Sequence, residues 1–247
     1  MVLLQRRSQR TQRTRVGADR AASALAGPGD TVLAIWNRPE DELLLAGALV
    51  AAAERGGAHV VRAVATGAAS AAHSVTLVSD HESGAAHVPR ARGLRAVQRV
   101  IEVYGPDVVL TFDADGVTGD PDRRAVARWV ARALKVADPG GGIAHVVVDV
   151  AARWPEELVQ RMHLADAFWP GFPVRRTSGV GCDVLLDDDE VGTKMMALDQ
   201  AQPGASLRAR LTASDFGRLA AIEGYRAVND AASAALSRLG EMAGVAA

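Results

Sequence analysis

The chain has 247 residues, of which 49% are hydrophobic and 23% are charged, and its formal net charge at pH 7 is −1. This is the composition of an ordinary globular protein with one well-buried core, and it gives no reason to expect nucleic acid or an anionic surface as a partner. No apolar run reaches the roughly 20 residues that span a membrane, and the single cysteine, Cys182, excludes an internal disulfide framework and suits a reducing cytoplasm.

The first 20 residues are rich in arginine, with Asp19 as their single acid: Arg6, Arg7, Arg10, Arg13, Arg15 and Arg20. No apolar segment follows Arg6-Arg7, so this is neither a secretory nor a twin-arginine signal. We expect a basic arm and a short helix over residues 1–26, and a single α/β domain over residues 27–247. The arm is either solvated, as most such arms are, or held by a second subunit.

A strand, an acidic turn and a helix follow over Thr31–Ala53. The apolar run Thr31–Trp36 predicts a strand buried on both faces of a parallel sheet, and Leu43–Ala53 predicts a buried helix. Ligands of open parallel sheets bind beyond the carboxyl ends of the strands. The turn therefore supplies candidate site residues: Trp36, Asn37, Arg38, Glu40, Asp41 and Glu42. Alternatively, its acids only complement the helix dipole, at about 0.3–1 kcal/mol each.

Two more strands are predicted at His59–Thr66 and Ser74–Ser79. Asp80 and His81 follow the second of these and are secondary candidates for substrate binding, although a lone histidine in a polar loop is more often an ordinary surface residue. Apolar residues at helical intervals predict a helix over Arg92–Tyr104.

A second strand-end junction resembles the first. Asp107–Phe112 predicts another buried strand, and Asp120-Pro121-Asp122 begins a helix that continues to Val136. The carboxyl ends of parallel strands meet at one edge of a sheet, so the two acidic junctions can face each other across one crevice.

The remaining pattern alternates strand and helix, which predicts a three-layer α/β/α sandwich with a mainly parallel sheet. Trp169 lies in an aromatic run that is either a lid packed on the core or a stacking wall for a flat substrate. The last helix covers either the core or a second copy of the chain. The predicted strands are Ile143–Val150 and Gly179–Leu186, and the predicted helices are Pro155–Leu164, Val191–Leu198, Ser214–Ala227 and Asn229–Met242.

Both junctions resemble motifs of the PIG-L/LmbE-like zinc-dependent de-N-acetylases. Arg38-Pro39-Glu40-Asp41-Glu42 stands where that family has His-Pro-Asp-Asp-Glu. Gly119–Val126, after Pro106–Thr111, stands where it has Gly-His-Pro-Asp-His-Arg-x-Val after a Pro-Asp-Val-Val-x-Thr strand. The resemblance covers residues 31–150 and, faintly, the segments around Lys194 and Glu223–Tyr225, and it implies a Rossmann-like fold.

The sequence departs from the family at the metal ligands. The resemblance places the three zinc-binding positions at Arg38, Asp41 and Arg123, the general base at Glu40 and the residue that steadies the oxyanion at Asp120. Arginine keeps its proton near neutral pH and has no lone pair for a metal. With one ligand of three left, we expect no metal and no other cofactor.

We therefore expect acid/base catalysis by Glu40, Asp41 and Asp120, with Arg38 and Arg123 binding a substrate carboxylate or balancing the acids. The preferred hypothesis is a metal-independent enzyme on a small amine or carbonyl substrate, such as Pictet–Spengler-type condensation of an aromatic or amino-acid-like amine in specialised metabolism. The alternatives are an N-acetyl hydrolase with an atypical metal site and a non-catalytic scaffold. The expected partner is a small molecule, without nucleic acid or membrane, and a homo-oligomer is an open expectation.

Overall fold

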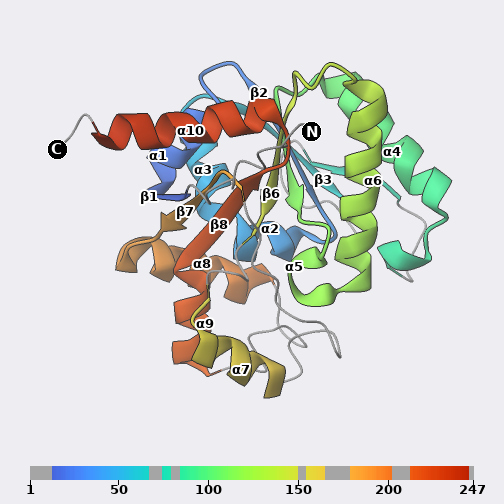
Figure 1. Cartoon of the computed structure of the whole chain (residues 1–247). Coiled ribbons are helices and arrows are strands. Elements are labelled where there is room, and N and C mark those ends of the chain that lie inside the picture. Colours follow the sequence, from blue (N-terminus) through green and yellow to red (C-terminus); the bar gives the residue numbers. More distant parts are fainter. Residues whose placement is uncertain are drawn as a thin grey trace, which may run out of the picture.

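The computed structural model describes residues 13–66, 74–78, 84–149, 154–164, 179–201 and 212–244. In these parts the chain forms an eight-stranded sheet with the order β1-β7-β8-β6-β5-β2-β3-β4 (Figure 1). Within it, β8 alone runs antiparallel to its neighbours, β6 and β7. The strands are β1 (Arg13–Val16), β2 (Thr31–Trp36), β3 (His59–Val64), β4 (Ser74–Thr76), β5 (Val108–Phe112), β6 (Ala144–Val148), β7 (Gly181–Leu185) and β8 (Ile222–Ala227).

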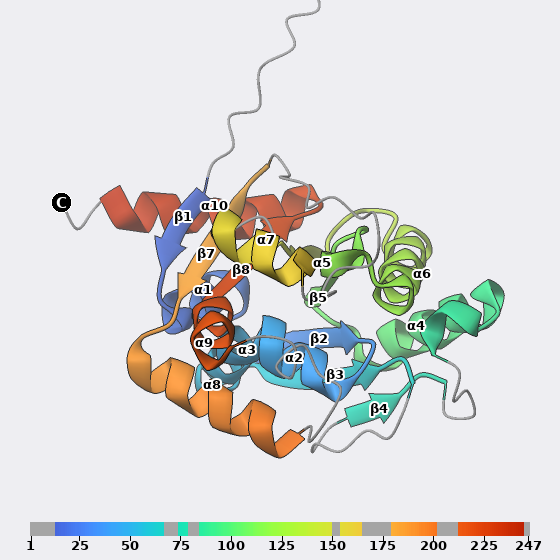
Figure 2. The same cartoon turned by 90° about the horizontal axis from the view of Figure 1, so that it is seen from below.

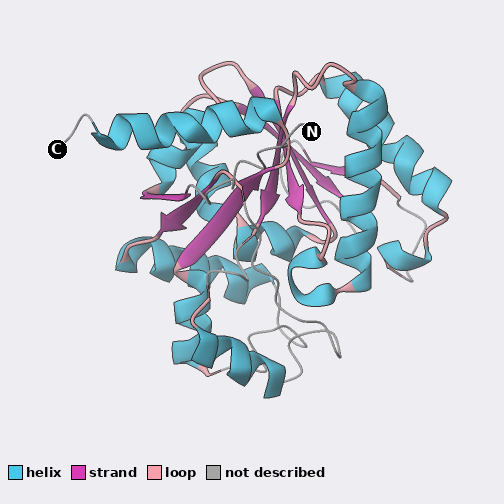
Figure 3. Cartoon of the chain, viewed as in Figure 1, coloured by secondary structure: helices cyan, strands magenta, loops and turns pink. Residues whose placement is uncertain are grey.

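Helices pack on both faces of this sheet, as Figures 2 and 3 show, which confirms the predicted α/β/α architecture. α1 and α3 lie on one face, with α10 alongside α1, whereas α4 and α6 pack together on the other. The helices are α1 (Ala18–Leu25), α2 (Pro39–Leu45), α3 (Gly47–Arg55), α4 (Arg90–Tyr104), α5 (Gly116–Gly119), α6 (Pro121–Ala137), α7 (Glu156–Leu164), α8 (Asp188–Ala201), α9 (Ala213–Ala220) and α10 (Asp230–Gly244). No helix in the described ranges has the length and apolar character needed to cross a membrane.

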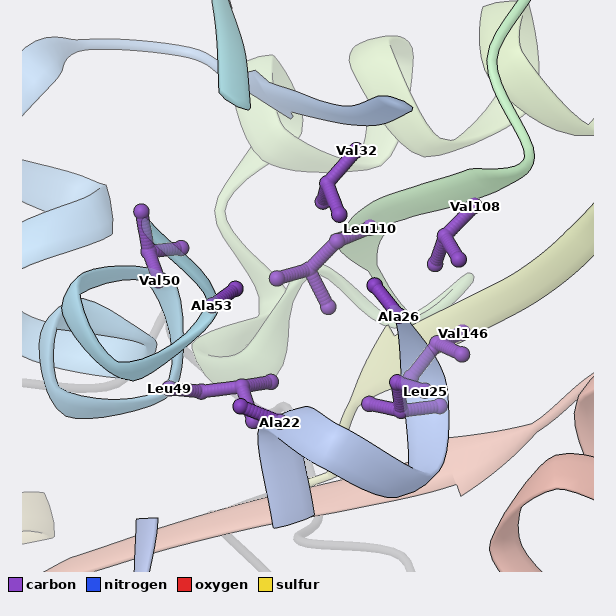
Figure 4. A pocket seen from close by; sticks show the side chains of 10 residues that line it. All are labelled: Ala22, Leu25, Ala26, Val32, Leu49, Val50, Ala53, Val108, Leu110 and Val146. Carbon is purple, nitrogen blue, oxygen red and sulfur yellow. The ribbon is translucent and has the colours of Figure 1, made fainter. Parts of the chain in front are cut away.

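The core between α1, α3 and the sheet is apolar throughout. Val32, Leu110 and Val146 point from three strands toward α1 and α3 and line a cavity of about 20 Å³ between these layers (Figure 4). A space of this size with an apolar lining offers no partner to a polar ligand. The cavity is therefore a packing gap in the core.

The sequence predicts no strand in the basic segment, yet Arg13–Val16 forms β1 at the edge of the sheet. β1 pairs in parallel with β7. The Arg13 guanidinium bonds Asp183 Oδ1 through Nε at 3.0 Å and Asp149 Oδ2 through Nη1 at 3.0 Å. Its side chain is only 9% exposed. These buried ion pairs fix the end of the basic segment on the sheet.

Two other expectations are wrong. The helix predicted to run through Leu43–Ala53 is interrupted at Ala46, where φ is −149° and α2 gives way to α3. The helix predicted over Ser214–Ala227 ends at Ala220, and the chain continues as β8. β8 fills the space between β6 and β7, so pairing on both sides outweighs local helix propensity. The predicted helices over Arg92–Tyr104, Asp122–Val136 and Asn229–Met242 are confirmed as α4, α6 and α10.

Candidate functional site

The first junction begins α2 directly after β2. Arg38 is extended, with φ −137° and ψ 160°, and Pro39 occupies the first helical turn. The Arg38 backbone N–H donates to Asp41 Oδ2 at 3.0 Å. One oxygen of Asp41 thus satisfies a backbone donor that the start of the helix would leave unpaired.

The second junction begins α6 after β5, and Asp120 is its N-cap. One carboxylate oxygen of Asp120 accepts from the backbone N–H groups of Asp122 and Arg123, at 2.8 and 3.0 Å. Pro121 follows in the first turn. Asp120, which the sequence nominates as a catalytic acid, is thus occupied by capping a 17-residue helix.

An ion pair brings the two junctions together, as their common position at strand ends predicts. The Arg123 Nε and Nη2 atoms donate to Asp41 Oδ1 at 3.0 and 2.6 Å. Arg123 Nη1 also donates to Thr118 Oγ1 at 3.3 Å, and its Cζ lies 5.8 Å from the centroid of the Phe112 ring. Burial alone would lower the pKa of Arg123, but the carboxylates of Asp41 and Asp120 outweigh it and raise that pKa.

Trp36 and Glu42 are buried next to this ion pair, and Phe112 lies between Trp36 and Arg123. Trp36 is 1% exposed and meets Phe112 edge to face, with ring centroids 5.2 Å apart. Its Nε1 donates to Glu42 Oε2 at 3.0 Å, and Arg62 Nε donates to Glu42 Oε1 at 2.7 Å. Burial raises the pKa of Glu42, against the opposing effect of Arg62. The sequence places both residues against the substrate, whereas the structure places them in the core beneath the junction.

Glu40 and Arg38 are the least engaged of the described site residues, although the charge of Glu40 helps to raise the pKa of Arg123. Arg38 is exposed and Glu40 is partly exposed at the start of α2. Within the described ranges, neither the Arg38 guanidinium nor the Glu40 carboxylate has a hydrogen bond or an ion pair. A free carboxylate can move a proton, and a free guanidinium can hold an anion in bidentate fashion.

Sequence reasoning missed a second group of charged residues beside the junctions. Asp113 follows β5, and its Oδ2 accepts from Arg226 Nη2 at 2.7 Å. Asp115 lies two residues further on, and burial raises its pKa, with a further increase from the charges of Asp113 and Asp149. Asp113 directly follows β5 and Asp149 directly follows the neighbouring strand β6, which is a signal that the sequence offers. Arg226, in contrast, comes from β8, which the sequence presents as helix.

The loop that carries Asp115 is strained. Val117 has φ 69° and ψ −50°, a conformation that a β-branched residue rarely adopts. Its N–H donates to Asp115 Oδ1 at 2.8 Å, and its side chain is buried. Strain of this kind persists where surrounding contacts over-determine the loop, here between β5 and α6.

Three of the predicted site residues, Asp80, His81 and Trp169, lie outside the described ranges. Their predicted roles in substrate binding stay predictions.

The residues at the junctions do not fit a zinc ion. Arg38 and Arg123 offer no lone pair, and both oxygens of Asp41 already accept hydrogen bonds from them. In the described ranges no group of three or more histidine, cysteine, aspartate or glutamate side chains could hold a metal. The zinc that the resemblance implies therefore has no suitable donors here.

Comparison with known proteins gives a likeness of fold. No family model and no curated protein match the chain. A deacetylase-bog complex from the teicoplanin biosynthesis pathway matches 81% of this chain and 99% of its own, at 15% identity and a TM-score of 0.48. The zinc inhibited form of teicoplanin deacetylase and a deacetylase-teicoplanin complex match at 14% identity, each with 81% of this chain and a TM-score of 0.48, covering 99% and 100% of their own chains. A likeness this distant says nothing about the activity of this chain.

Proposed function

We propose that the α2–α6 junction is the active site of a metal-independent enzyme that acts on a small amine or carbonyl substrate. Glu40 transfers protons and Arg38 binds a carboxylate of the substrate. The observation that carries this assignment is that some charged side chains at the junction are already hydrogen-bonded, whereas two others are not. Asp41 and Asp120 are held by Arg123 and by helix capping, whereas Glu40 and Arg38 have no hydrogen-bond or ion-pair partner within the described ranges.

Arg123 has a structural role in this proposal. It takes the place of a metal as the positive charge between the junctions and holds Asp41 at 2.6 Å. Arg38 is exposed and carries the planar fork that matches a carboxylate. Anion binding therefore belongs to Arg38.

The reaction we propose is condensation of a 2-arylethylamine, such as an aromatic amino acid, with a carbonyl compound, of the Pictet–Spengler type. The substrate ammonium group gives a proton to the Glu40 carboxylate, and the neutral amine nitrogen attacks the carbonyl carbon to give a carbinolamine. The Glu40 carboxylic acid then protonates the carbinolamine hydroxyl, and water leaves to form an iminium ion. A ring carbon then attacks the iminium carbon, and the Glu40 carboxylate removes the ring proton. One water is released and no oxidant is needed. Hydrolysis of an amide, by contrast, needs an activated water, and the junction has no donor set for the metal that would supply it.

Replacing Glu40 tests the proton-transfer role. Glu40→Gln keeps the size of the side chain but removes the base, so kcat should fall by ~10²–10⁴ with KM little changed. Arg38→Lys should instead raise KM, because a point charge cannot reproduce the bidentate fork. The control is Glu102→Gln, which removes an exposed carboxylate from α4. Initial rates over a panel of aromatic amines and aldehydes provide the measurement.

Full activity in Glu40→Gln would overturn the assignment. Turnover of N-acetylated sugars that depends on added zinc would favour the hydrolase alternative instead. If the protein neither bound nor turned over the amines and aldehydes or the N-acetylated sugars, the result would favour the scaffold alternative.

A further inference from the structure

Polar residues form a row across the carboxyl edge of the sheet. Val32 of β2 is paired with Val108 of β5, which is paired with Ala144 of β6. The β2–β5 pairing ends at Ala34 and Leu110, and the β5–β6 pairing ends at Phe112 and Val148. Counted onward in the same register, the residues that directly follow the three strands are equivalent in position, and all three are polar: Asn37, Asp113 and Asp149.

The three residues also share one face of the sheet. Val32, Leu110 and Val146 point toward α1 and α3 in Figure 4. Side chains alternate along a strand, so odd positions of these strands, such as Val147, point to the opposite face. Arg226 is opposite Val147 in the β6–β8 pairing and donates to Asp113, which places Asp113 on that opposite face. The row therefore lies on the face that α4 and α6 cover, beside the junction that carries Glu40 and Arg123.

Carboxylates outnumber cations along this row. Arg226 pairs with Asp113 at 2.7 Å, and Arg13 pairs with Asp149 at 3.0 Å. Asp115, within electrostatic reach of both aspartates, is partly exposed. Its Oδ1 accepts from the Val117 N–H, but no residue in the described ranges donates to its Oδ2. Asp115 therefore has no ion pair among the described residues, although the charge of Arg226 acts to lower its pKa.

Asn37 supplies an acceptor that the fold leaves unsatisfied. It is 5% exposed, and its Oδ1 is buried without a hydrogen-bond partner within the described ranges. In Asn229, by contrast, both polar atoms of the side chain are hydrogen-bonded. Oδ1 accepts from the backbone N–H groups of His145 and Ala232, and Nδ2 donates to the Ile143 carbonyl oxygen. Buried polar groups are normally paired, so the Asn37 oxygen marks the position of a missing N–H or O–H donor.

We propose that Asn37 Oδ1 and the Asp115 carboxylate bind the protonated amine of the substrate, a primary alkylammonium group. This subsite rests on the proposed function, because it holds the amine of the same reaction. An ammonium group has three donors and no acceptor, which matches a row of acceptors with excess negative charge. The substrate carboxylate is repelled by the same row and binds at Arg38.

Binding of 2-phenylethylamine to the full chain tests the subsite, with N-acetyl-2-phenylethylamine as the uncharged comparison. Calorimetry should detect the amine and not the amide. Asp115→Asn removes the charge and should weaken binding by ~10–100-fold, and Asn37→Leu should weaken it by ~10-fold. Glu102→Gln, the surface control on α4, should leave the dissociation constant unchanged.

Thermal unfolding of the ligand-free variants adds a readout that does not depend on any ligand. Asn37→Leu removes an unsatisfied acceptor, so its unfolding temperature should equal or exceed that of the parent chain. Asn229→Leu removes three satisfied hydrogen bonds and should lower it. If Asn37→Leu lowered the unfolding temperature as much as Asn229→Leu does, the Asn37 oxygen would have a structural partner and the subsite would be wrong.

Binding and turnover measurements test the amine subsite and the proposed reaction independently of each other. Amine binding that responds to both site variants, without turnover, supports the subsite and contradicts the reaction. Turnover with an unchanged KM for the amine in Asp115→Asn overturns the subsite and leaves the reaction standing. Failure of the parent chain to bind 2-phenylethylamine also overturns the subsite.

Discussion

His145 is a buried titratable residue that the proposed chemistry does not use. It is 7% exposed on β6, and its Nε2 has no hydrogen-bond partner in the described part of the chain. Burial and, to a smaller extent, the charge of Arg226 together lower the pKa of His145 to about 4, against the opposing effect of Asp113. The imidazole is therefore neutral in the folded protein over a range where the unfolded chain takes up a proton.

This difference predicts a pH-dependent loss of stability. Between pH 6.5 and about 4 the unfolded state binds more protons at this residue than the folded state, so the free energy of unfolding should fall as the pH is lowered through that window. The His145 contribution amounts to up to about 3 kcal/mol. Denaturant unfolding of the parent chain and of His145→Gln, at several pH values between 4 and 7, measures it.

Other carboxylates also titrate in this range, so the difference between the two proteins is the informative quantity. His145→Gln should gain stability relative to the parent chain as the pH falls. A difference that stays constant from pH 7 to pH 4 would show that His145 has an ordinary pKa in the folded protein.

A buried hydrogen-bond network around one carboxylate stabilises the break between helices α2 and α3. Glu223 of β8 is fully buried and accepts from the backbone N–H groups of Ala48 and Leu49, at 2.9 and 3.1 Å. Lys194 Nζ and the Tyr225 hydroxyl donate to it at 2.7 and 2.6 Å. The carboxylate thus satisfies the first turn of α3, and α2 with its acidic turn is positioned against that anchor.

Removing the cation from this network should destabilise the fold. Lys194→Met keeps much of the side-chain volume but leaves Glu223 buried with one donor fewer, so the free energy of unfolding should fall by about 3–5 kcal/mol. Lys135→Met, on the exposed surface of α6, is the matched control and should change it by less than about 0.5 kcal/mol. Denaturant unfolding measures both. A loss below about 1 kcal/mol for Lys194→Met would mean that water replaces the ammonium group.

The elements that the sequence predicts well are those with local signals. β2 and β5 are continuous apolar runs, and Pro121 marks the first turn of α6. β8 carries no such signal, because Glu223, Tyr225 and Arg226 acquire their strand conformation from pairing with β6 and β7. The break at Ala46 is equally hidden, since it depends on a carboxylate more than 170 residues further along the chain.

At the scale of the whole molecule, the sequence predicts that the two junctions meet but not which side chains are free. The Asp41–Arg123 pair joins residues 82 positions apart, as the shared strand edge suggests. Burial of Glu42 against Trp36 and Arg62 depends on packing that no local pattern records. The sequence does not predict the charged row beside the junction, because Arg226, which pairs with Asp113 there, lies on the strand that the sequence presents as helix.

In the whole molecule, the junction of α2 and α6 has arginines at two of the positions where the resemblance implies zinc ligands, and Arg123 supplies the positive charge there. The Arg123 guanidinium and the Arg38 backbone N–H bind the two oxygens of Asp41, and neither arginine side chain has a lone pair for zinc. The most direct measurement is the zinc content of the purified chain after exposure to excess zinc and removal of unbound ion. We expect less than about 0.1 zinc per chain, whereas about one zinc per chain that disappears in Asp41→Asn would show that the junction is a metal site after all.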